Sequence, residues 1–334
     1  MNVIRTWFKN ARPIALPQSL LPSILAVCMA SQIDGFTWWL AIMAVLGVVA
    51  GHLGMNLFDD YFDYKVKDSS HRANLTHKGF RARISKCDYL TSGQATLRDL
   101  LTACLVFGAI AITLGAVIWI FRGNFILILA LVTAVIGVSY SGPPLRLSYH
   151  GLGELVIGIM FGPLLMTGVY YAACGIWNYS VLFVSVPVGM LVMNIVYSHA
   201  IMDYEPDKEV GKNTFAILLK TKKNMIIFHA FLVSFAFVII ISGVLLKYLS
   251  VFYLLVLLTL PLALYQHYMM RKFVDDPDRV FIPKWWMGPM SKNWERLQAA
   301  GLDWFMIRWL SARNLLSFFC LMIIVACFLP KIYL

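Results

Sequence analysis

Charge is scarce in this sequence. Of its 334 residues, 13% are Asp, Glu, Lys or Arg and 60% are hydrophobic, whereas a soluble domain carries about 25% charged residues. The composition therefore excludes an ordinary soluble domain and indicates a polytopic membrane protein. Acidic residues are the scarcest charged group, with 17 Asp and Glu against 28 Lys and Arg. Acids that occur close together are consequently the first candidates for a functional site.

Several common catalytic patterns are also missing. The six cysteines are scattered, without a CxxC pair, so they predict neither a disulfide framework nor a thiolate metal site. No GxSxG, P-loop or GxGxxG motif occurs in a strand–helix context. Four histidines in or near apolar runs, His52, His199, His229 and His267, lack HxxxH or HxxE spacing, so we interpret them as satisfied polar residues, with His199 one turn before an acidic motif.

Long apolar runs are what the sequence has in abundance. A membrane span needs about 20 mostly apolar residues. By that rule we predict an all-α fold of about nine transmembrane helices within one integral-membrane domain, 1–334. The predicted spans are 14–33, 37–58, 97–121, 125–141, 152–174, 180–201, 225–247, 250–270 and 313–330.

The distribution of basic residues predicts an orientation. With a cytoplasmic N-terminus, 25 of the 28 Lys and Arg residues fall in the segments 1–12, 59–99, 142–151, 202–224 and 271–313, as the positive-inside rule requires. The net charge of +11 is then explained by the lipid bilayer and an anionic substrate, without nucleic acid. We expect a multi-pass protein of a bacterial inner membrane; the sequence leaves its oligomeric state open.

Two acidic clusters follow the second and sixth predicted spans, so both lie on the cytoplasmic side. In Asn56–Lys65, Asp60 and Asp63 stand at i, i+3, and Asn56 lies one turn earlier, so all three share a helix face. In Ala200–Thr214, Asp203 and Asp207 stand at i, i+4. Hard carboxylate oxygens beside basic residues suit Mg²⁺ that in turn holds a diphosphate.

This arrangement predicts an enzyme acting on a polyprenyl diphosphate. Asp60, Asp63, Asp203 and Asp207 would bind Mg²⁺ and activate the leaving group, while the apolar spans enclose the tail. Lys212 and basic residues of the cytoplasmic loop 64–96, here Arg72, Lys78 and Arg81, would donate hydrogen bonds to the diphosphate. We interpret that loop as a flap over the site.

Other charged or aromatic residues leave alternatives open. Glu154 either pairs with Arg146 or lines the acceptor end of a pocket. Glu205 and Glu209 point away from the Asp203/Asp207 face into solvent, while Asp59 and Asp68 are possible additions to the metal site. The segment 275–311, with five tryptophans, is predicted to be an interfacial insertion, including a surface helix over 304–309.

At this point the sequence resembles the UbiA superfamily of intramembrane prenyltransferases. The two motifs Asp60-Tyr-Phe-Asp63-Tyr-Lys and Asp203-Tyr-Glu-Pro-Asp207-Lys-Glu-Val-Gly-Lys212-Asn-Thr are similar to its paired aspartate-rich motifs. The opening Ala11-Arg12-Pro13 and the turn Tyr140-Ser-Gly-Pro-Pro-Leu-Arg-Leu-Ser-Tyr-His-Gly-Leu-Gly-Glu154 most resemble the 1,4-dihydroxy-2-naphthoate polyprenyltransferase branch. Asp59 stands where the family's first motif commonly has Asn, and Lys67, beside Asp68, fills the slot of a later acid.

The resemblance implies several expectations. It implies nine helices around a central cavity, Mg²⁺, a polyprenyl diphosphate donor, and prenylation of a naphthoate ring with loss of CO₂ in menaquinone synthesis. It also implies that Arg12, Asn56, Tyr140 and Glu154 contribute to substrate binding. The alternatives are another acceptor (4-hydroxybenzoate, homogentisate, a haem or a lipid-linked sugar) and a cation-coupled transporter.

Overall fold

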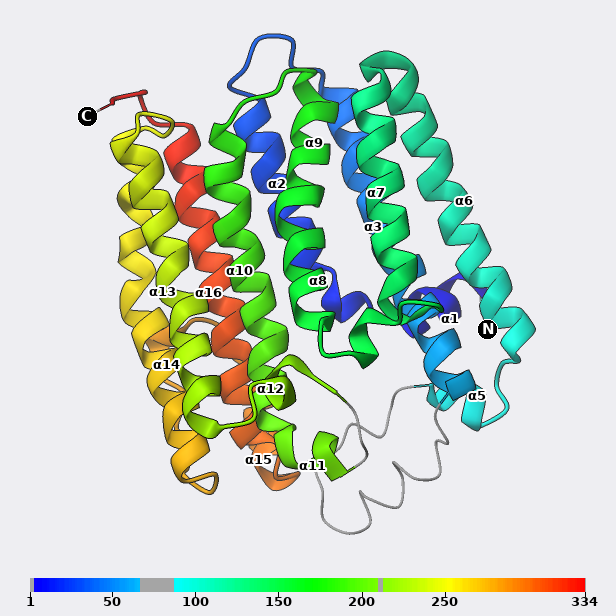
Figure 1. Ribbon diagram of the computed structural model, residues 1–334, viewed down its shortest axis with the longest axis vertical. Coiled ribbons are helices and arrows are strands. Elements are labelled where there is room, and N and C mark those ends of the chain that lie inside the picture. Colours follow the sequence, from blue (N-terminus) through cyan, green and yellow to red (C-terminus); the bar gives the residue numbers. More distant parts are fainter. Residues whose placement is uncertain (1–2, 67–86, 210–212, 334) are drawn as a thin grey trace.

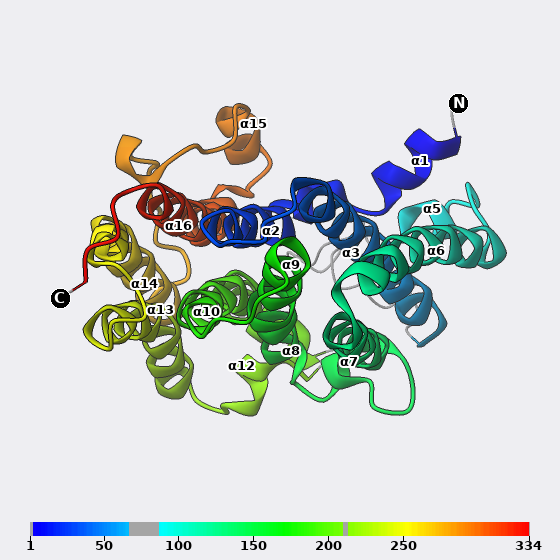
Figure 2. The same ribbon diagram turned by 90° about the horizontal axis from the view of Figure 1, so that it is seen from above.

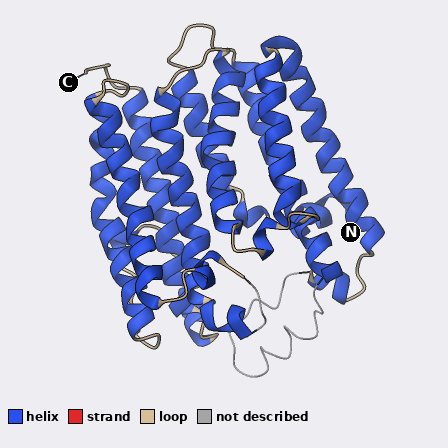
Figure 3. Cartoon of the chain, viewed as in Figure 1, coloured by secondary structure: helices blue, strands red, loops and turns tan. Residues whose placement is uncertain are grey.

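The computed structural model describes residues 3–66, 87–209 and 213–333, which form helices joined by short loops and contain no strand (Figure 3). The first part of the chain forms α1 (Val3–Asn10), η1 (Pro13–Ala15), α2 (Pro17–Ala30), α3 (Trp38–Val66), α5 (Asp88–Thr91), α6 (Leu97–Arg122), α7 (Asn124–Ser141) and η2 (Leu147–Tyr149). The middle forms α8 (Gly153–Ile159), the π-helix η3 (Met160–Leu164), α9 (Leu165–Cys174), α10 (Ser180–Met202), α11 (Tyr204–Glu209) and α12 (Phe215–Leu218). The last part forms α13 (Lys222–Leu245), η4 (Val251–Thr259), α14 (Leu260–Asp275), η5 (Trp285–Met287), α15 (Trp294–Ala299) and α16 (Asp303–Cys327).

The prediction of an all-α polytopic membrane protein is confirmed. Within the described residues, eight helices are long and apolar enough to cross a bilayer, and α2, with 14 residues, is a shorter apolar helix in the place of the first predicted span. Two of the eight are composite. The fifth predicted span is built from α8, η3 and α9, and the eighth begins as the 3₁₀-helix η4 before α14.

The helices form two groups with a pair of helices between them. Seen from above (Figure 2), α10, α13, α14 and α16 lie together, α3, α6 and α7 lie together, and α2 and α9 stand between them. α2 contacts α3, α9 and α16, while α10 contacts α8, α13 and α16. On the outer flank, α6 and α7 carry exposed aliphatic side chains such as Ile112 and Ile120, both 74% exposed. Such surfaces suit contact with lipid chains.

The last helix differs from the prediction. α16 begins at Asp303, ten residues before the predicted start, so the predicted separate surface helix over 304–309 is wrong. Arg308 is 0% exposed. Its guanidinium donates to the carbonyls of Met269, Trp304 and Arg279, and these hydrogen bonds compensate the burial of the charge. In a hydropathy pattern this arginine marks the end of a span, which is why the predicted start was too late. In the structure it is a buried residue within α16.

The second predicted span is also longer than expected. α3 continues through both aspartates to Val66, eight residues beyond the predicted end. Its last turns, together with α5, α11 and α12, lie at the lower end of the bundle in Figure 1. We call this the acidic end, because it carries Asp60, Asp63, Asp203 and Asp207. Within the expected loop 64–96, α5 packs its buried Tyr89 and Leu90 beside Leu53 and Leu57 of α3.

Candidate active site

Asp60 is the most enclosed carboxylate at the acidic end, with 1% of its surface exposed. Its Oδ1 lies 3.1 Å from the Arg12 guanidinium, and its Oδ2 accepts a hydrogen bond of 3.0 Å from the Tyr89 hydroxyl. A buried carboxylate is tolerated only when charge and hydrogen bonds compensate it. Three segments far apart in sequence, before η1, in α3 and in α5, therefore meet at this one side chain.

Arg12 is fixed from several sides. It adopts a left-handed backbone (φ 57°) before Pro13, and its guanidinium donates to the carbonyl of Asn56 at 2.7 Å. The side chain of Asn56 donates back to the carbonyl of Ala11 at 2.9 Å. Burial lowers the pKa of Arg12, but attraction by Asp60 and Asp59 outweighs it, so the net shift is upward. The guanidinium is therefore a permanent cation at this site. Arg12 and Asn56 thus lie beside Asp60; the sequence predicted a shared helix face for Asn56 and did not predict the contact of Arg12.

Asp63 and Asp59 meet the next part of the chain. The Tyr149 hydroxyl in η2 donates to Asp63, and the Ser141 hydroxyl at the end of α7 donates to Asp59. Tyr140 is the residue before Ser141 in the last turn of α7. The end of α7 and η2 therefore supply two hydroxyl donors to the first acidic cluster.

Both tyrosines that donate to this cluster remain protonated over the physiological range. Burial, and then the neighbouring Asp60 carboxylate, raise the pKa of Tyr89 well above its ordinary value. Burial, and then the hydrogen bond to Asp63, raise the pKa of Tyr149 in the same direction. Each phenol is held as a donor because the adjacent negative charge disfavours a phenolate.

In the second cluster, Asp203 has its described contacts within its own segment. α10 ends at Met202, and the helical turn continues because the amide of Asp207 donates to the carbonyl of Asp203 at 2.8 Å. The Asp203 carboxylate lies 3.0 Å from His199 Nε2, one turn earlier in α10. Asp207 is buried. His199 thus contacts the site, as its spacing suggested.

Glu205 and Glu209 are exposed, as predicted from their position on the helix. They lie on the same short segment as Asp203 and Asp207 but face away from the enclosed side. Glu205 and Glu209 are therefore suitable control positions, because they are acidic residues of the same segment that lie outside the candidate site.

The turn between α7 and α8 joins the two clusters. Tyr149 donates to Asp63, the next residue, His150, forms an isolated β-bridge with Asn213, and the buried Glu154 carboxylate accepts from the amide of Phe215 at 3.1 Å. Among the described residues Glu154 binds this amide and does not pair with Arg146. The ends of both acidic motifs are therefore tied to one short stretch of chain.

Gly151 makes that turn possible. Its φ of 76° lies in the left-handed region. A Cβ at this position would lie 2.4 Å from Leu218 Cδ1 and 3.2 Å from the carbonyl oxygen of Thr214. Only glycine lets the turn approach the segment after the second motif this closely.

The donor set of both clusters is made of carboxylate oxygens, which Mg²⁺ prefers. Within residues 3–66, 87–209 and 213–333, no three His, Cys, Asp or Glu side chains form a group that could hold one ion. Each cluster instead offers a pair of acids, so a bound ion would take its remaining ligands from phosphate oxygens and water. The residues fit Mg²⁺ that binds together with a diphosphate. Assignment of the four aspartates as its ligands stays a prediction.

Some predicted residues lie outside the described part of the chain: Arg72, Lys78, Arg81, Asp68 and Lys212. Other contacts were not predicted from the sequence, namely those of Tyr89, Ser141 and Tyr149 with the three α3 carboxylates. Tyr149 lies within the turn that the resemblance singled out, so its motif was a usable signal. Tyr89 had none, because its hydrogen bond exists only after α5 packs on α3.

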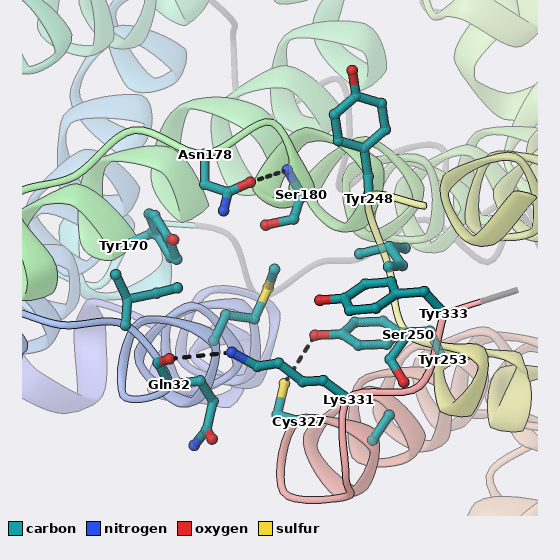
Figure 4. Close-up of a pocket in the computed structure, with 14 residues that line it drawn as sticks. Gln32, Tyr170, Asn178, Ser180, Tyr248, Ser250, Tyr253, Cys327, Lys331 and Tyr333 are labelled. Atoms are coloured by element: carbon teal, nitrogen blue, oxygen red, sulfur yellow. Dashed lines mark hydrogen bonds between the residues drawn. The ribbon is translucent and has the colours of Figure 1, made fainter. Parts of the chain in front are cut away.

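A separate cavity lies at the other ends of the spans (Figure 4). Its lining includes Gln32, Tyr170, Tyr253 and Lys331, which come from the end of α2, from α9, from η4 and from the residues after α16. The Tyr253 hydroxyl contacts Cys327 Sγ at 3.4 Å, and Lys331 donates to the carbonyl of Gln32 at 3.4 Å. None of the aspartates of the acidic end lines it.

Comparison with known proteins finds relatives in several bacteria. The chain is 24% identical to 1,4-dihydroxy-2-naphthoate octaprenyltransferase of Mycobacterium tuberculosis, over 68% of this chain and 74% of that protein. It is 27% identical to the Bacillus subtilis protein of the same name, over 70% and 72%. It is 25% identical to 2-carboxy-1,4-naphthoquinone phytyltransferase of Synechocystis, over 90% and 94%.

Solved structures share the fold. A digeranylgeranylglyceryl phosphate synthase aligns with a TM-score of 0.64 at 17% identity, covering 98% of this chain and 99% of that one. A UbiA homologue of Archaeoglobus fulgidus, bound to GPP and Mg²⁺, aligns with a TM-score of 0.55 at 17% identity, covering 92% and 99%.

The sequence also matches the model of the UbiA prenyltransferase family over residues 19–288. That range takes in both acidic motifs and most of the membrane helices. Together with the paired motifs and the helical bundle, the match identifies an integral membrane enzyme that transfers prenyl groups. The chain therefore belongs to the UbiA prenyltransferase family.

Proposed function

We propose that this protein transfers a polyprenyl group from a polyprenyl diphosphate to 1,4-dihydroxy-2-naphthoate, with Mg²⁺, as a step of menaquinone synthesis. The observation that carries the proposal is the turn between α7 and α8, which binds Asp63 through Tyr149 and the segment after Asp207 through Glu154. A diphosphate carries charge on both phosphoryl groups. Two acid pairs held at one end of a bundle suit two points of attachment for such a leaving group.

The proposed roles follow from the contacts. Asp60 and Asp63 on α3, and Asp203 and Asp207 after α10, hold Mg²⁺, which when bound neutralises the diphosphate and makes it a better leaving group. Arg12 holds Asp60 in place through their ion pair. Lys212, Arg72, Lys78 and Arg81 donate to the phosphate oxygens. The apolar helices enclose the prenyl tail and exclude water from the allylic cation.

Acceptor binding is assigned to the same end of the bundle. Tyr140, in the last turn of α7, and Glu154, at the start of α8, are assigned to substrate binding there. The names of the relatives favour a naphthoate over the other aromatic acceptors. Prenylation of that ring displaces its carboxylate as CO₂.

We place the acidic end on the cytoplasmic side of a bacterial inner membrane, because the segments that lie there carry most of the basic residues. The whole chain, residues 1–334, is proposed to form one integral-membrane domain. Residues 1–12 and the basic loop 64–96 face the cytoplasm, and the tryptophan-rich segment 275–302 lies in the headgroup layer.

Membranes containing the protein test the proposal. They are incubated with Mg²⁺, a radiolabelled polyprenyl diphosphate and a panel of acceptors, and the products are identified by mass spectrometry. We expect prenylated naphthoquinol with dihydroxynaphthoate, loss of activity in EDTA, and recovery with added Mg²⁺. Asp203→Ala should abolish turnover, whereas Glu205→Gln, which alters an exposed acid of the same motif, should not. Product formed only with 4-hydroxybenzoate or homogentisate would reassign the acceptor, and full activity of Asp203→Ala would remove the metal assignment.

A further inference from the structure

His52 lies on the same stripe of α3 as the acidic motif. At 100° per residue, His52, Asn56, Asp59, Asp60 and Asp63 fall within about 100° of the helix circumference. His52 is 9% exposed and stands one turn from Asn56 and about 12 Å along the axis from Asp60. It is therefore an enclosed polar group deeper in the bundle than the carboxylates.

One nitrogen of this imidazole has a defined partner. His52 Nδ1 lies 2.7 Å from the hydroxyl of Ser19 on α2, and that hydroxyl also donates to the carbonyl of Leu16 at 3.1 Å. Depending on the tautomer, either the hydroxyl or the ring nitrogen donates across the contact between Ser19 and His52. In both cases Ser19 occupies Nδ1, and Nε2 is the ring nitrogen that remains.

The other nitrogen is available. Nε2 of His52 makes no hydrogen bond with any residue that the structure describes. It is also not one of the described polar atoms that are both fully buried and without a partner, so it keeps some accessible surface. An enclosed imidazole nitrogen without a partner is costly unless another molecule satisfies it. Ser19 orients the ring but leaves this second nitrogen for a ligand.

Two neighbours suggest the kind of ligand. The ring of Phe161 lies 4.8 Å from the imidazole, at 57°. Phe161 belongs to the π-helix η3, and such distortions are common at functional sites. The Arg12 guanidinium binds the carbonyl of Asn56, one turn along α3 from His52. An aromatic face, a hydrogen-bonding nitrogen and a cation together match a flat ring that carries a hydroxyl and a carboxylate.

We propose that His52 binds the aromatic acceptor, with Nε2 hydrogen-bonded to a ring hydroxyl while the ring packs beside Phe161. This rests on the proposed prenyl transfer and names a residue for its acceptor. His52 lies about 12 Å along α3 from Asp60, so the two side chains serve different parts of the reacting pair, Asp60 the diphosphate and His52 the acceptor ring. His52 therefore sets acceptor affinity and orientation and leaves diphosphate binding unchanged.

Amide substitutions separate the two nitrogens. The side-chain amide of Gln reaches the position of Nε2, and that of Asn reaches the position of Nδ1. We expect His52→Ala and His52→Asn to raise the acceptor KM about 10- to 100-fold, the usual range for losing one hydrogen bond within a binding site. His52→Gln should recover most of that loss. The KM for polyprenyl diphosphate should stay within about twofold in all three.

Ser19 and Ser23 provide a matched pair of controls. Both are 0% exposed on α2, one turn apart, but Ser23 donates only to the carbonyl of Ser19. Ser19→Ala should raise the acceptor KM and Ser23→Ala should not, with similar unfolding temperatures. Recovery by Asn in place of Gln, or a change in donor KM alone, would overturn the proposal. Kinetics are measured with the acceptor that the unmodified protein turns over. If none is prenylated, prenyl transfer itself has failed; normal turnover with unaffected His52 variants would refute this inference alone.

Discussion

The two acidic clusters are built differently. Around the α3 cluster, the described partners come from elsewhere in the chain: Arg12, Tyr89 and Tyr149. The described partner of Asp203 is His199 on its own helix, one turn away. The first cluster is therefore a product of tertiary packing, whereas the contact described for Asp203 follows from local helix geometry. Asp60 thus takes part in joining distant segments, while Asp203 is bound by a neighbour one turn away.

The largest effect that tests this contrast comes from removing one charge in each cluster. We expect Asp60→Asn and Asp203→Asn both to lower activity at least about 100-fold, since each removes a group that stabilises charge during the reaction. Their stabilities should differ. Asp60→Asn should cost about 2 kcal/mol, less than the 3–5 kcal/mol of a fully buried pair, because Arg12 is 35% exposed.

Asp203→Asn should change stability by no more than about 0.5 kcal/mol, as for other helical i, i+4 pairs. Thermal unfolding in detergent, followed by tryptophan fluorescence, measures both variants. Equal destabilisation would show that the second cluster is held as firmly as the first.

A smaller effect comes from removing the phenols of the first cluster. Tyr89→Phe and Tyr149→Phe should each lower stability by about 1 kcal/mol, the net contribution of one hydrogen bond, and lower activity several-fold. Because the pKa of each phenol is raised in the fold, the donated bonds persist below pH 10 and are lost only above the ordinary phenol pKa. Activity profiles of the unmodified protein and the two variants should therefore be parallel from pH 6 to 9. A variant profile that diverges within this range would contradict the assignment.

The smallest effect is expected at His199. His199→Gln removes one partly exposed neighbour of Asp203. Activity should therefore change less than about twofold, and the unfolding temperature should change by less than about 2 °C. Activity assays at several Mg²⁺ concentrations measure it. A large rise in the Mg²⁺ requirement would place His199 among the residues that orient the metal ligands.

Much of the fold could be predicted from the chain. Apolar runs longer than about 18 residues indicate spans whatever their neighbours are, and both acidic motifs were found from spacing alone. The start of α16 could not be predicted, because Arg308 reads as a polar end until carbonyls of α14 and the following segment enclose it. The end of α3 was also predicted too early. Its charged residues look like the end of a span in the sequence, but the helix continues through them because partners from other segments compensate their charge.

By itself, the sequence determined the membrane class, the helical architecture, the family and the positions of the two acidic motifs, because each depends on local pattern: run length, periodicity and motif. Only the tertiary structure decided what surrounds those aspartates. Arg12, Tyr89 and Tyr149 reach Asp60 and Asp63 through contacts between residues 29 to 86 positions apart. Glu154 joins the second motif in the same way. Such contacts depend on how helices pack, and local sequence carries no record of them.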